Sequence, residues 1–334
     1  STSSENELEK NAPTNSDLWT DGHYATAFDN EGEAGIDGTT EEKAYEIRTA
    51  EQLALLAYRI NTSSTNSTYR SLYYVQTADI NLSLHYWDAI GTSSYYFSGH
   101  YDGGNFTISG LYTEAGSDSA YSYQGLFGYV RGQSNTTIKN IGIIGSNIQG
   151  YSKVGGVVGS ASHFATVTNC YNTGSVTGRD DRVGGVVGDA NSSVTITNCY
   201  NTGSVSGSDN QVGGVVGYAF SSTVTNCYNT GSIDGNYWVG GTAGDTYSST
   251  ITNCYNTGSV SGSDVVGGVV GSASNFATVT NCYNTGNIAE RSSRAVPDPT
   301  DSPRRGGVVG SADSSDITNN YYGGNCTLSY GIGS

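Results

Sequence analysis

Five cysteines recur at a nearly constant spacing, and they are the first residues in this chain whose type could support chemistry. Cys170, Cys199, Cys227, Cys254 and Cys282 are separated by 29, 28, 27 and 28 residues. A zinc site needs close cysteine pairs or converging histidines, and this spacing offers neither. Disulfides between neighbouring copies stay open as an alternative, although side chains that point the same way in a stack meet at an awkward angle. We expect mainly a buried column of free thiols that act as small apolar fillers.

The regular cysteines belong to an internal repeat. The phrase VGGVVG, or a close variant, begins at residues 154, 183, 212, 239, 266 and 305, and TVTNCYNTG or a variant follows all but the last, where the phrase has diverged. The alternating branched residues of TVTNCY predict short strands, and NTG predicts a turn because Asn and Gly tolerate left-handed backbone angles. A repeat this short cannot bury its apolar side alone, so repeats must stack. We therefore predict an all-β fold, a β-solenoid of about seven or eight coils.

In a solenoid, residues at one repeat position form a column along the axis. The residues on either side of each cysteine then predict an asparagine ladder, with amides bonded along the axis, and a stacked tyrosine ladder. Exposed tyrosines could alternatively bind sugar rings or a neighbouring surface. The asparagines are Asn169, Asn198, Asn226, Asn253 and Asn281, and the tyrosines are Tyr171, Tyr200, Tyr228, Tyr255 and Tyr283.

The chain before the repeats divides into two predicted parts. Residues 1–43 form an acidic N-terminal arm that is poor in large apolar residues and would not fold alone. Residues 44–94 form a predicted cap, in which Thr49 and Gln52 fit a capping box that opens a short amphipathic helix. Such a helix would cover the open end of the solenoid, which we place at residues 95–334.

Charge is distributed unevenly along the chain. The formal net charge of −16 argues against a nucleic-acid-binding protein, and no apolar run is long enough to span a membrane. Thirteen of the 30 acidic residues lie within residues 1–51. Basic residues gather in the inserted loop 289–305, which predicts head-to-tail self-association through Arg291, Arg294, Arg304 and Arg305.

Catalytic and metal-binding patterns are weak. Polysaccharide-cleaving solenoids need acids and bases clustered in one groove, whereas the four lysines lie early and the four histidines (23, 85, 100 and 163) are scattered. Loop carboxylates lack the glycine-rich calcium repeat, so we expect them to be solvated; they are Asp180, Asp181, Asp209, Asp234 and Asp264. We expect no enzyme activity, no cofactor and no metal.

Residues 44–334 resemble the GLUG-repeat protein family. The resemblance is carried by GLFGYV at 125–130, the serial VGGVVG and NCYNTGSV phrases, YFSGHYDGGNFTISGL at 96–111 and YEIRTAEQLALLA at 45–57. It implies a β-solenoid from an exported bacterial surface protein, such as an adhesin or the repeat region beside an immunoglobulin-cleaving metallopeptidase. It implies no catalytic residues within the repeats.

We therefore expect an extracellular or cell-surface structural protein, a rigid subunit of a fibre or adhesive stalk that associates with itself. The first residue is Ser and Met is absent, which fits a chain trimmed after export. The first alternative is a monomeric adhesin module that binds glycan or host matrix. The second is a polysaccharide-active enzyme.

Overall fold

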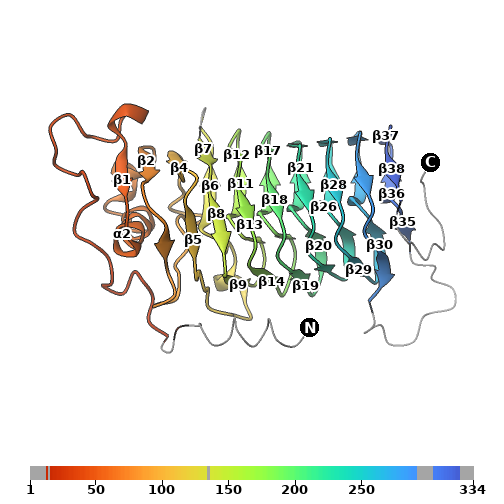
Figure 1. Cartoon of the computed structure of the whole chain (residues 1–334), viewed down its shortest axis with the longest axis horizontal. Coiled ribbons are helices and arrows are strands. Elements are labelled where there is room, and N and C mark those ends of the chain that lie inside the picture. Colours follow the sequence, from red (N-terminus) through yellow and green to blue (C-terminus); the bar gives the residue numbers. More distant parts are fainter. Residues whose placement is uncertain (1–12, 14–15, 134–135, 292–303, 324–334) are drawn as a thin grey trace.

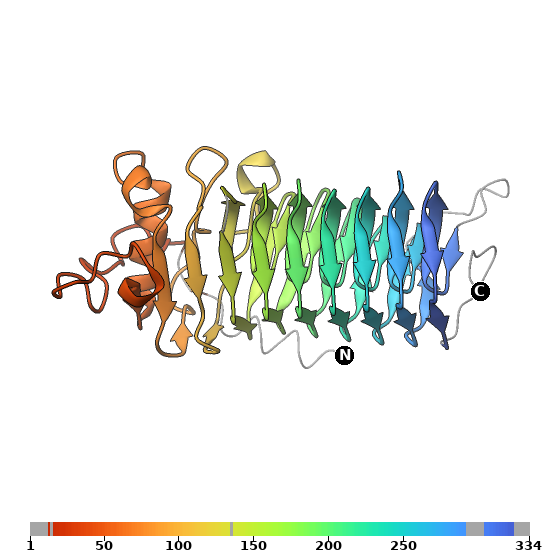
Figure 2. The same cartoon turned by 90° about the horizontal axis from the view of Figure 1, so that it is seen from above.

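The protein is a β-solenoid of about eight turns, and its strands are parallel throughout the described residues. The computed structural model describes residue 13 and residues 16–133, 136–291 and 304–323. Five sheets run along the long axis, and each coil adds one strand to most of them (Figures 1 and 2). The predicted fold class is confirmed. None of the described helices is long and apolar enough to cross a membrane.

Two sheets carry the features discussed below. The ten-stranded threonine sheet comprises β1 (Tyr45–Ile47), β2 (Tyr73–Gln76), β4 (His100–Asp102), β7 (Thr137–Lys139), β12 (Thr166–Thr168), β17 (Thr195–Thr197), β22 (Thr223–Thr225), β27 (Thr250–Thr252), β32 (Thr278–Thr280) and β37 (Asp316–Thr318). The nine-stranded tyrosine sheet comprises β3 (Ile80–Asn81), β5 (Thr107–Ser109), β8 (Gly142–Ile144), β13 (Tyr171–Asn172), β18 (Tyr200–Asn201), β23 (Tyr228–Asn229), β28 (Tyr255–Asn256), β33 (Tyr283–Asn284) and β38 (Tyr321–Tyr322).

The three other sheets close the coil. One has β6 (Phe127–Arg131), β11 (Val158–Ser162), β16 (Val187–Asn191), β21 (Val216–Phe220), β26 (Ala243–Tyr247), β31 (Val270–Ser274) and β36 (Val309–Asp313). The next has β9 (Asn147–Gly150), β14 (Ser175–Gly178), β19 (Val205–Gly207), β24 (Ile233–Asp234), β29 (Val260–Gly262) and β34 (Ile288–Glu290). The last has β10 (Val154–Gly155), β15 (Val183–Gly184), β20 (Asn210–Gly213), β25 (Tyr237–Gly240), β30 (Asp264–Gly267) and β35 (Arg305–Gly306).

The core is a set of apolar columns inside the coils. Identical repeat positions pair across neighbouring strands, so that Val167 lies beside Ile196 and Ile196 beside Val224. These side chains are completely buried. A fully buried Val or Ile side chain stabilises a fold by about 1.5–3 kcal/mol. Each added coil contributes such side chains to one continuous apolar interior and so stabilises the rod.

A helical cap covers the N-terminal end. Helix α2 (Ala50–Asn61) begins with the predicted capping box between Thr49 and Gln52, and it buries Leu53, Leu56 and Ile60. The short helix α3 (Asn66–Tyr69) follows it, and two single 3-10 turns, η1 (Glu41–Lys43) and η2 (Ser119–Tyr121), lie in connecting segments. The predicted capping helix is therefore confirmed.

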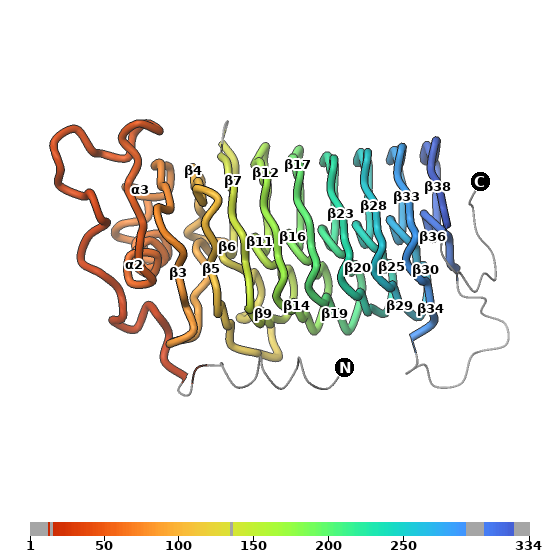
Figure 3. The backbone as a smooth tube through the Cα atoms, in the orientation of Figure 1, coloured from red at the N-terminus to blue at the C-terminus, as the bar shows by residue number. Residues whose placement is uncertain are grey.

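The described part of the predicted acidic arm folds back on its own chain. Figure 3 shows this segment beside α2 and α3 at the N-terminal end. Trp19 and Phe28 are buried there, and the Trp19 indole N–H donates to the Leu82 carbonyl at 3.0 Å. Arg59 of α2 forms an ion pair with Glu31 at 2.9 Å. The cap thus provides the apolar surface that the arm itself lacks.

The predicted turn lies at a different asparagine. The left-handed corner residue is Asn169 of TNCY, with φ of 53°, and the equivalent asparagines of later coils share this conformation. Asn172 of NTG is instead the last residue of β13 and is completely buried. The prediction for NTG was therefore wrong in its backbone angles, because the coil bends after Asn172 without a left-handed residue.

Candidate ligand-binding pocket and side-chain ladders

The five repeat cysteines form one buried column of free thiols. Each Sγ lies near backbone carbonyls, as in the 3.3 Å contact from Cys199 to the Thr197 oxygen. Burial raises the pKa of the Cys199, Cys227 and Cys254 thiols well above the ordinary value. Uncharged thiols are poor nucleophiles and poor metal ligands, so this column fills space. Cys326 lies outside the described residues.

The outer asparagine ladder runs along the corner between the threonine and tyrosine sheets. Asn169, Asn198, Asn226 and Asn253 each donate an amide hydrogen to the equivalent residue one coil nearer the N-terminus, at 3.0–3.3 Å. The structure places Asn281 at the same corner position. The ladder reaches Asn140, whose amide donates to the Asp102 carboxylate at 2.9 Å.

The tyrosine column lies two residues further along each coil. Rings from Tyr171 to Tyr283 stack with centroids 4.8 Å apart and planes within 4° of parallel. The ring of Tyr171 lies over Gly142, where an added Cβ would come within 2.2 Å of the ring carbon Cζ. These rings are partly exposed along most of the column and form a continuous aromatic ridge on the outside of the rod.

A second, inner asparagine ladder was not identified from the sequence. It comprises the NTG asparagines Asn172, Asn201, Asn229, Asn256 and Asn284, all completely buried. The side-chain amides of the first four each donate a hydrogen bond to the ladder asparagine of the next coil toward the C-terminus, at 2.8–2.9 Å. Each also donates to the carbonyl two residues ahead, as Asn229 does to Gly231. The sequence has Asn at this position in five repeats, which could have indicated a ladder, but a turn at NTG accounted for the same Asn equally well.

The arginines predicted for self-association meet acidic residues of their own chain. Arg291 pairs with Asp234 at 3.1 Å, and Arg304 pairs with Asp264 at 3.1 Å. The side chain of Arg305 is only 5% exposed and lies 3.3 Å from Glu290. Arg294 lies outside the described residues. Arg305 therefore offers little surface to a partner, whereas Arg304 is 55% exposed.

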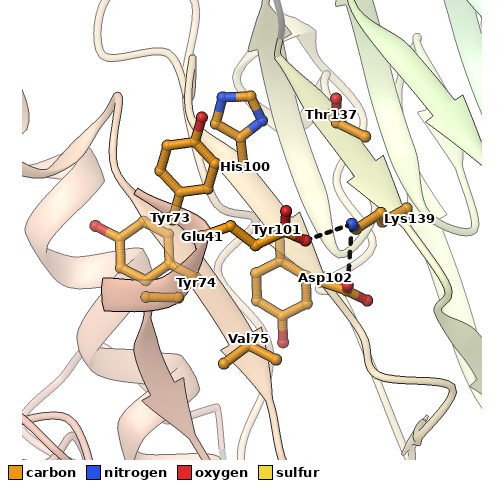
Figure 4. Close-up of a pocket in the computed structure, with 10 residues that line it drawn as sticks. Glu41, Tyr73, Tyr74, Val75, His100, Tyr101, Asp102, Thr137 and Lys139 are labelled. Atoms are coloured by element: carbon orange, nitrogen blue, oxygen red, sulfur yellow. Dashed lines mark hydrogen bonds and ion pairs between the residues drawn. The ribbon is translucent and has the colours of Figure 1, made fainter. Parts of the chain in front are cut away.

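A pocket of about 470 Å³ lies on the outer face of the threonine sheet near its N-terminal end (Figure 4). Strand register builds it, because Tyr73, His100 and Thr137 share one column while Val75, Asp102 and Lys139 share the next. Residues between them, Tyr74 and Tyr101, point into the core. The pocket is lined by Glu41, Ala44, Tyr73, Tyr74, Val75, His100, Tyr101, Asp102, Thr137 and Lys139.

One wall of the pocket is aromatic and the other is charged. The rings of Tyr73 and His100 stack at 4.0 Å between centroids and 13° between planes. The Lys139 ammonium bridges Glu41 at 3.0 Å and Asp102 at 3.1 Å (Figure 4). Glu41 belongs to η1, so the arm supplies one side of the pocket.

The charge states of the pocket follow from these contacts. Burial lowers the pKa of His100, so its imidazole is neutral at pH 7. The hydrogen bond from Lys139 to Glu41 raises the pKa of Lys139 despite some burial. Burial disfavours charge on Asp102, but hydrogen bonds from Gly104, Asn140 and Lys139 outweigh it and lower the pKa of Asp102. The formal charges of Glu41, Asp102 and Lys139 sum to −1.

In the sequence, Lys139 counted as one of four early lysines and His100 as one of four scattered histidines, and neither was assigned to a site. The spacing between Tyr73 and His100 is 27 residues, one coil length, which was a usable signal. Aromatic stacks beside a few polar groups are typical of small-ligand sites. A ligand that contains a ring can therefore place the apolar face of that ring against the aromatic wall of the pocket. Polar groups at the edge of the ligand ring can then hydrogen-bond to the charged wall.

The loop carboxylates are less exposed than predicted. Asp234 and Asp264 are paired with arginines as described above. The ligand atoms of Asp180, Asp181 and Asp209 lie within 4.8 Å of one another. Burial, followed by the charges of the other two, raises the pKa of Asp180. This acidic cluster alone does not define a site.

Comparisons with known proteins agree with the fold. A family model described as the GLUG motif matches residues 150–177, 208–234 and 262–289. No curated protein matches the chain. A solved structure from Bacteroides ovatus, named a putative immunoglobulin A1 protease, is similar with a TM-score of 0.61 and 22% identity. The match covers 84% of this chain and 86% of that one, and at this identity it shows the fold alone.

Proposed function

Because this chain is a GLUG-repeat protein built as a β-solenoid, we propose that it acts outside a bacterial cell as a stiff adhesive stalk that binds glycan. The observation that carries the proposal is the convergence of the Tyr73–His100 stack and the Lys139 cluster on the outside of the rod. The GLUG motif supports the extracellular location.

The rigidity of the solenoid supports its proposed role as a stalk. Five sheets of parallel strands carry backbone hydrogen bonds along the axis, and two asparagine ladders and a tyrosine ladder reinforce them. Most coils contact their neighbours through all five sheets, so bending the rod would strain many bonds at once. A stiff rod holds a binding pocket at a constant distance from whatever carries the chain.

The pocket favours a neutral sugar. A pyranose has an apolar face that can pack on the Tyr73–His100 stack and hydroxyls that can bond to Glu41, Asp102 and Lys139. The net charge of −1 among these three groups opposes sulfated sugars or uronic acids.

Titration of the full chain with neutral oligosaccharides tests this function. We expect saturable binding that Tyr73→Ala weakens roughly tenfold, about 1.4 kcal/mol, as for an aromatic anchor. Tyr237→Ala is the matched control, because Tyr237 is 43% exposed and lies in a distant coil. Binding lost equally in both variants, or acidic glycans preferred over neutral ones, would refute the pocket as the neutral-sugar site.

Head-to-tail self-association is a second proposal, and Arg304 is the most exposed of the three loop arginines that the structure describes. Its exposure and its position at the C-terminal coils leave it able to exchange Asp264 for a carboxylate of another copy. Light scattering at low salt should show masses above the monomer that Arg304→Glu reduces. Assemblies that survive both this substitution and high salt would contradict an electrostatic contact.

A further inference from the structure

Two histidines and a carboxylate meet where the arm joins the cap. Ligand atoms of Asp17, His23 and His85 all lie within 4.8 Å of one another. Asp17 is exposed and the two histidines are partly buried, so solvent reaches the group from one side. The glycan pocket is separate from this group, because the two share no residue.

Backbone pairing explains the meeting. Leu18 and Tyr86 form a parallel bridge, with hydrogen bonds from Trp19 N to the Tyr86 oxygen and from Tyr86 N to the Asp17 oxygen, both at 3.0 Å. Asp17 and His85 each precede a bridged residue, so they lie side by side. A turn closed by Asp21 N on the Leu18 oxygen at 3.0 Å returns the chain toward His23.

The two imidazoles pack against each other, and that of His85 also packs against Trp19. The rings of His23 and His85 stack at 3.8 Å between centroids and 15° between planes. Trp19 packs edge-on against His85 with centroids 4.9 Å apart. The Nδ1 atom of His85 is buried and has no hydrogen-bond partner among the described residues. A buried nitrogen that lacks a hydrogen-bond partner destabilises the fold unless a ligand satisfies it.

We propose that Asp17, His23 and His85 bind a divalent transition-metal ion, of the Zn²⁺ class, that fastens the arm to the cap. Two imidazoles and one carboxylate are a donor set that favours Zn²⁺ over Ca²⁺ or Mg²⁺, which take oxygen ligands. Tetrahedral Zn²⁺ holds its ligand atoms roughly 3.4 Å apart and lies in the plane of each imidazole that binds it, so the stacked rings of His23 and His85 must move apart when the ion binds. Water would complete the coordination on the exposed side.

Zinc titration of the full chain after treatment with a chelator tests the site. We expect one equivalent of Zn²⁺ to bind, with visible absorption from Co²⁺ in its place. His23→Ala should weaken binding more than the roughly 10–100-fold that loss of an outer-shell partner causes, and Asp17→Ala should weaken it as well. His163→Ala is the matched control, because His163 is an exposed histidine in a distant coil.

A structural readout separates binding from misfolding. Zn²⁺ should slow hydrogen exchange at the Trp19 indole in the wild type and in His163→Ala, but not in His23→Ala. Circular dichroism should show the same β-fold in all variants without metal. The proposal is overturned if the wild type binds no Zn²⁺, if His23→Ala and Asp17→Ala bind it as tightly, or if Ca²⁺ displaces it readily.

Discussion

The inner asparagine ladder provides the sharpest test of what holds the coils together. Asn229 is completely buried and makes four hydrogen bonds. Its amide donates to the Gly231 oxygen and the Asn256 Oδ1 at 2.8 Å, and its Oδ1 accepts from Asn201 at 2.9 Å and from the Gly231 N–H at 3.3 Å. In Asn229→Ala, four buried partner sites lose a hydrogen bond.

The expected cost follows from that count. The Asn256 Oδ1 still accepts from the Gly258 N–H, so three groups are left unsatisfied. At the lower limit of about 1 kcal/mol for each of them, Asn229→Ala should destabilise the protein by roughly 3 kcal/mol. Few single substitutions cost so much, and those that do usually break buried networks. Denaturant unfolding followed by circular dichroism measures the change. Hydrogen exchange should show whether the loss is confined to neighbouring coils, as expected for a stacked repeat.

The outer ladder supplies the matched control. Asn226 lies three residues before Asn229. Its side-chain amide forms two hydrogen bonds, one with Asn198 at 3.3 Å and one with Asn253 at 3.2 Å, and both are exposed to solvent. Its φ is 56°, so Asn226→Gly removes the amide without adding backbone strain. We expect a loss below about 1 kcal/mol. If Asn229→Ala costs no more than Asn226→Gly, the inner ladder does not stabilise the rod as argued.

Three further predictions concern other columns. Gly142→Ala should lower the melting temperature in a thermal scan, because its Cβ would overlap the Tyr171 ring; an unchanged value would contradict that packing. The lowered pKa of Asp102 means that its contribution to stability is present above its ordinary pKa near 3.8 and is lost as the pH falls through the lowered value. Asp102→Asn should therefore flatten the acid side of the unfolding profile below about pH 4. In a Cys326→Ser background, the column thiols should resist a thiol reagent at pH 8 until the protein unfolds, and rapid labelling of the native protein would refute their burial.

The repeats made the fold predictable, whereas the details depended on which side of each strand faces inward. Val167, Ile196 and Val224 stand at one repeat position, so stacking and the apolar interior followed from the sequence. Asn169 and Asn172 lie three residues apart in one phrase, and both suit a corner. Only the paths of the two strands decide that Asn169 turns while Asn172 points inward.

The pocket was not predictable for a different reason. Its residues come from the arm and from coils that precede the first VGGVVG phrase, where the 27-residue spacing between Tyr73 and His100 indicates their register but nothing in the sequence places Glu41 beside them. Glu41 approaches Lys139 across 98 residues, through packing of the arm on the cap. The same applies to His23 and His85, which are brought together by a single backbone bridge.

The two asparagine ladders have opposite directions, and this difference links the rod to the pocket. Inner amides donate toward the C-terminus, whereas outer amides donate toward the N-terminus and end on the Asp102 carboxylate. Amides aligned in a chain polarise one another, so the outer ladder presents the positive end of its dipoles to an anion. That contact helps to hold Asp102 ionised, and Asp102 in turn holds Lys139 at the pocket wall. The repeat region is therefore an electrostatic support for the pocket as well as a mechanical one.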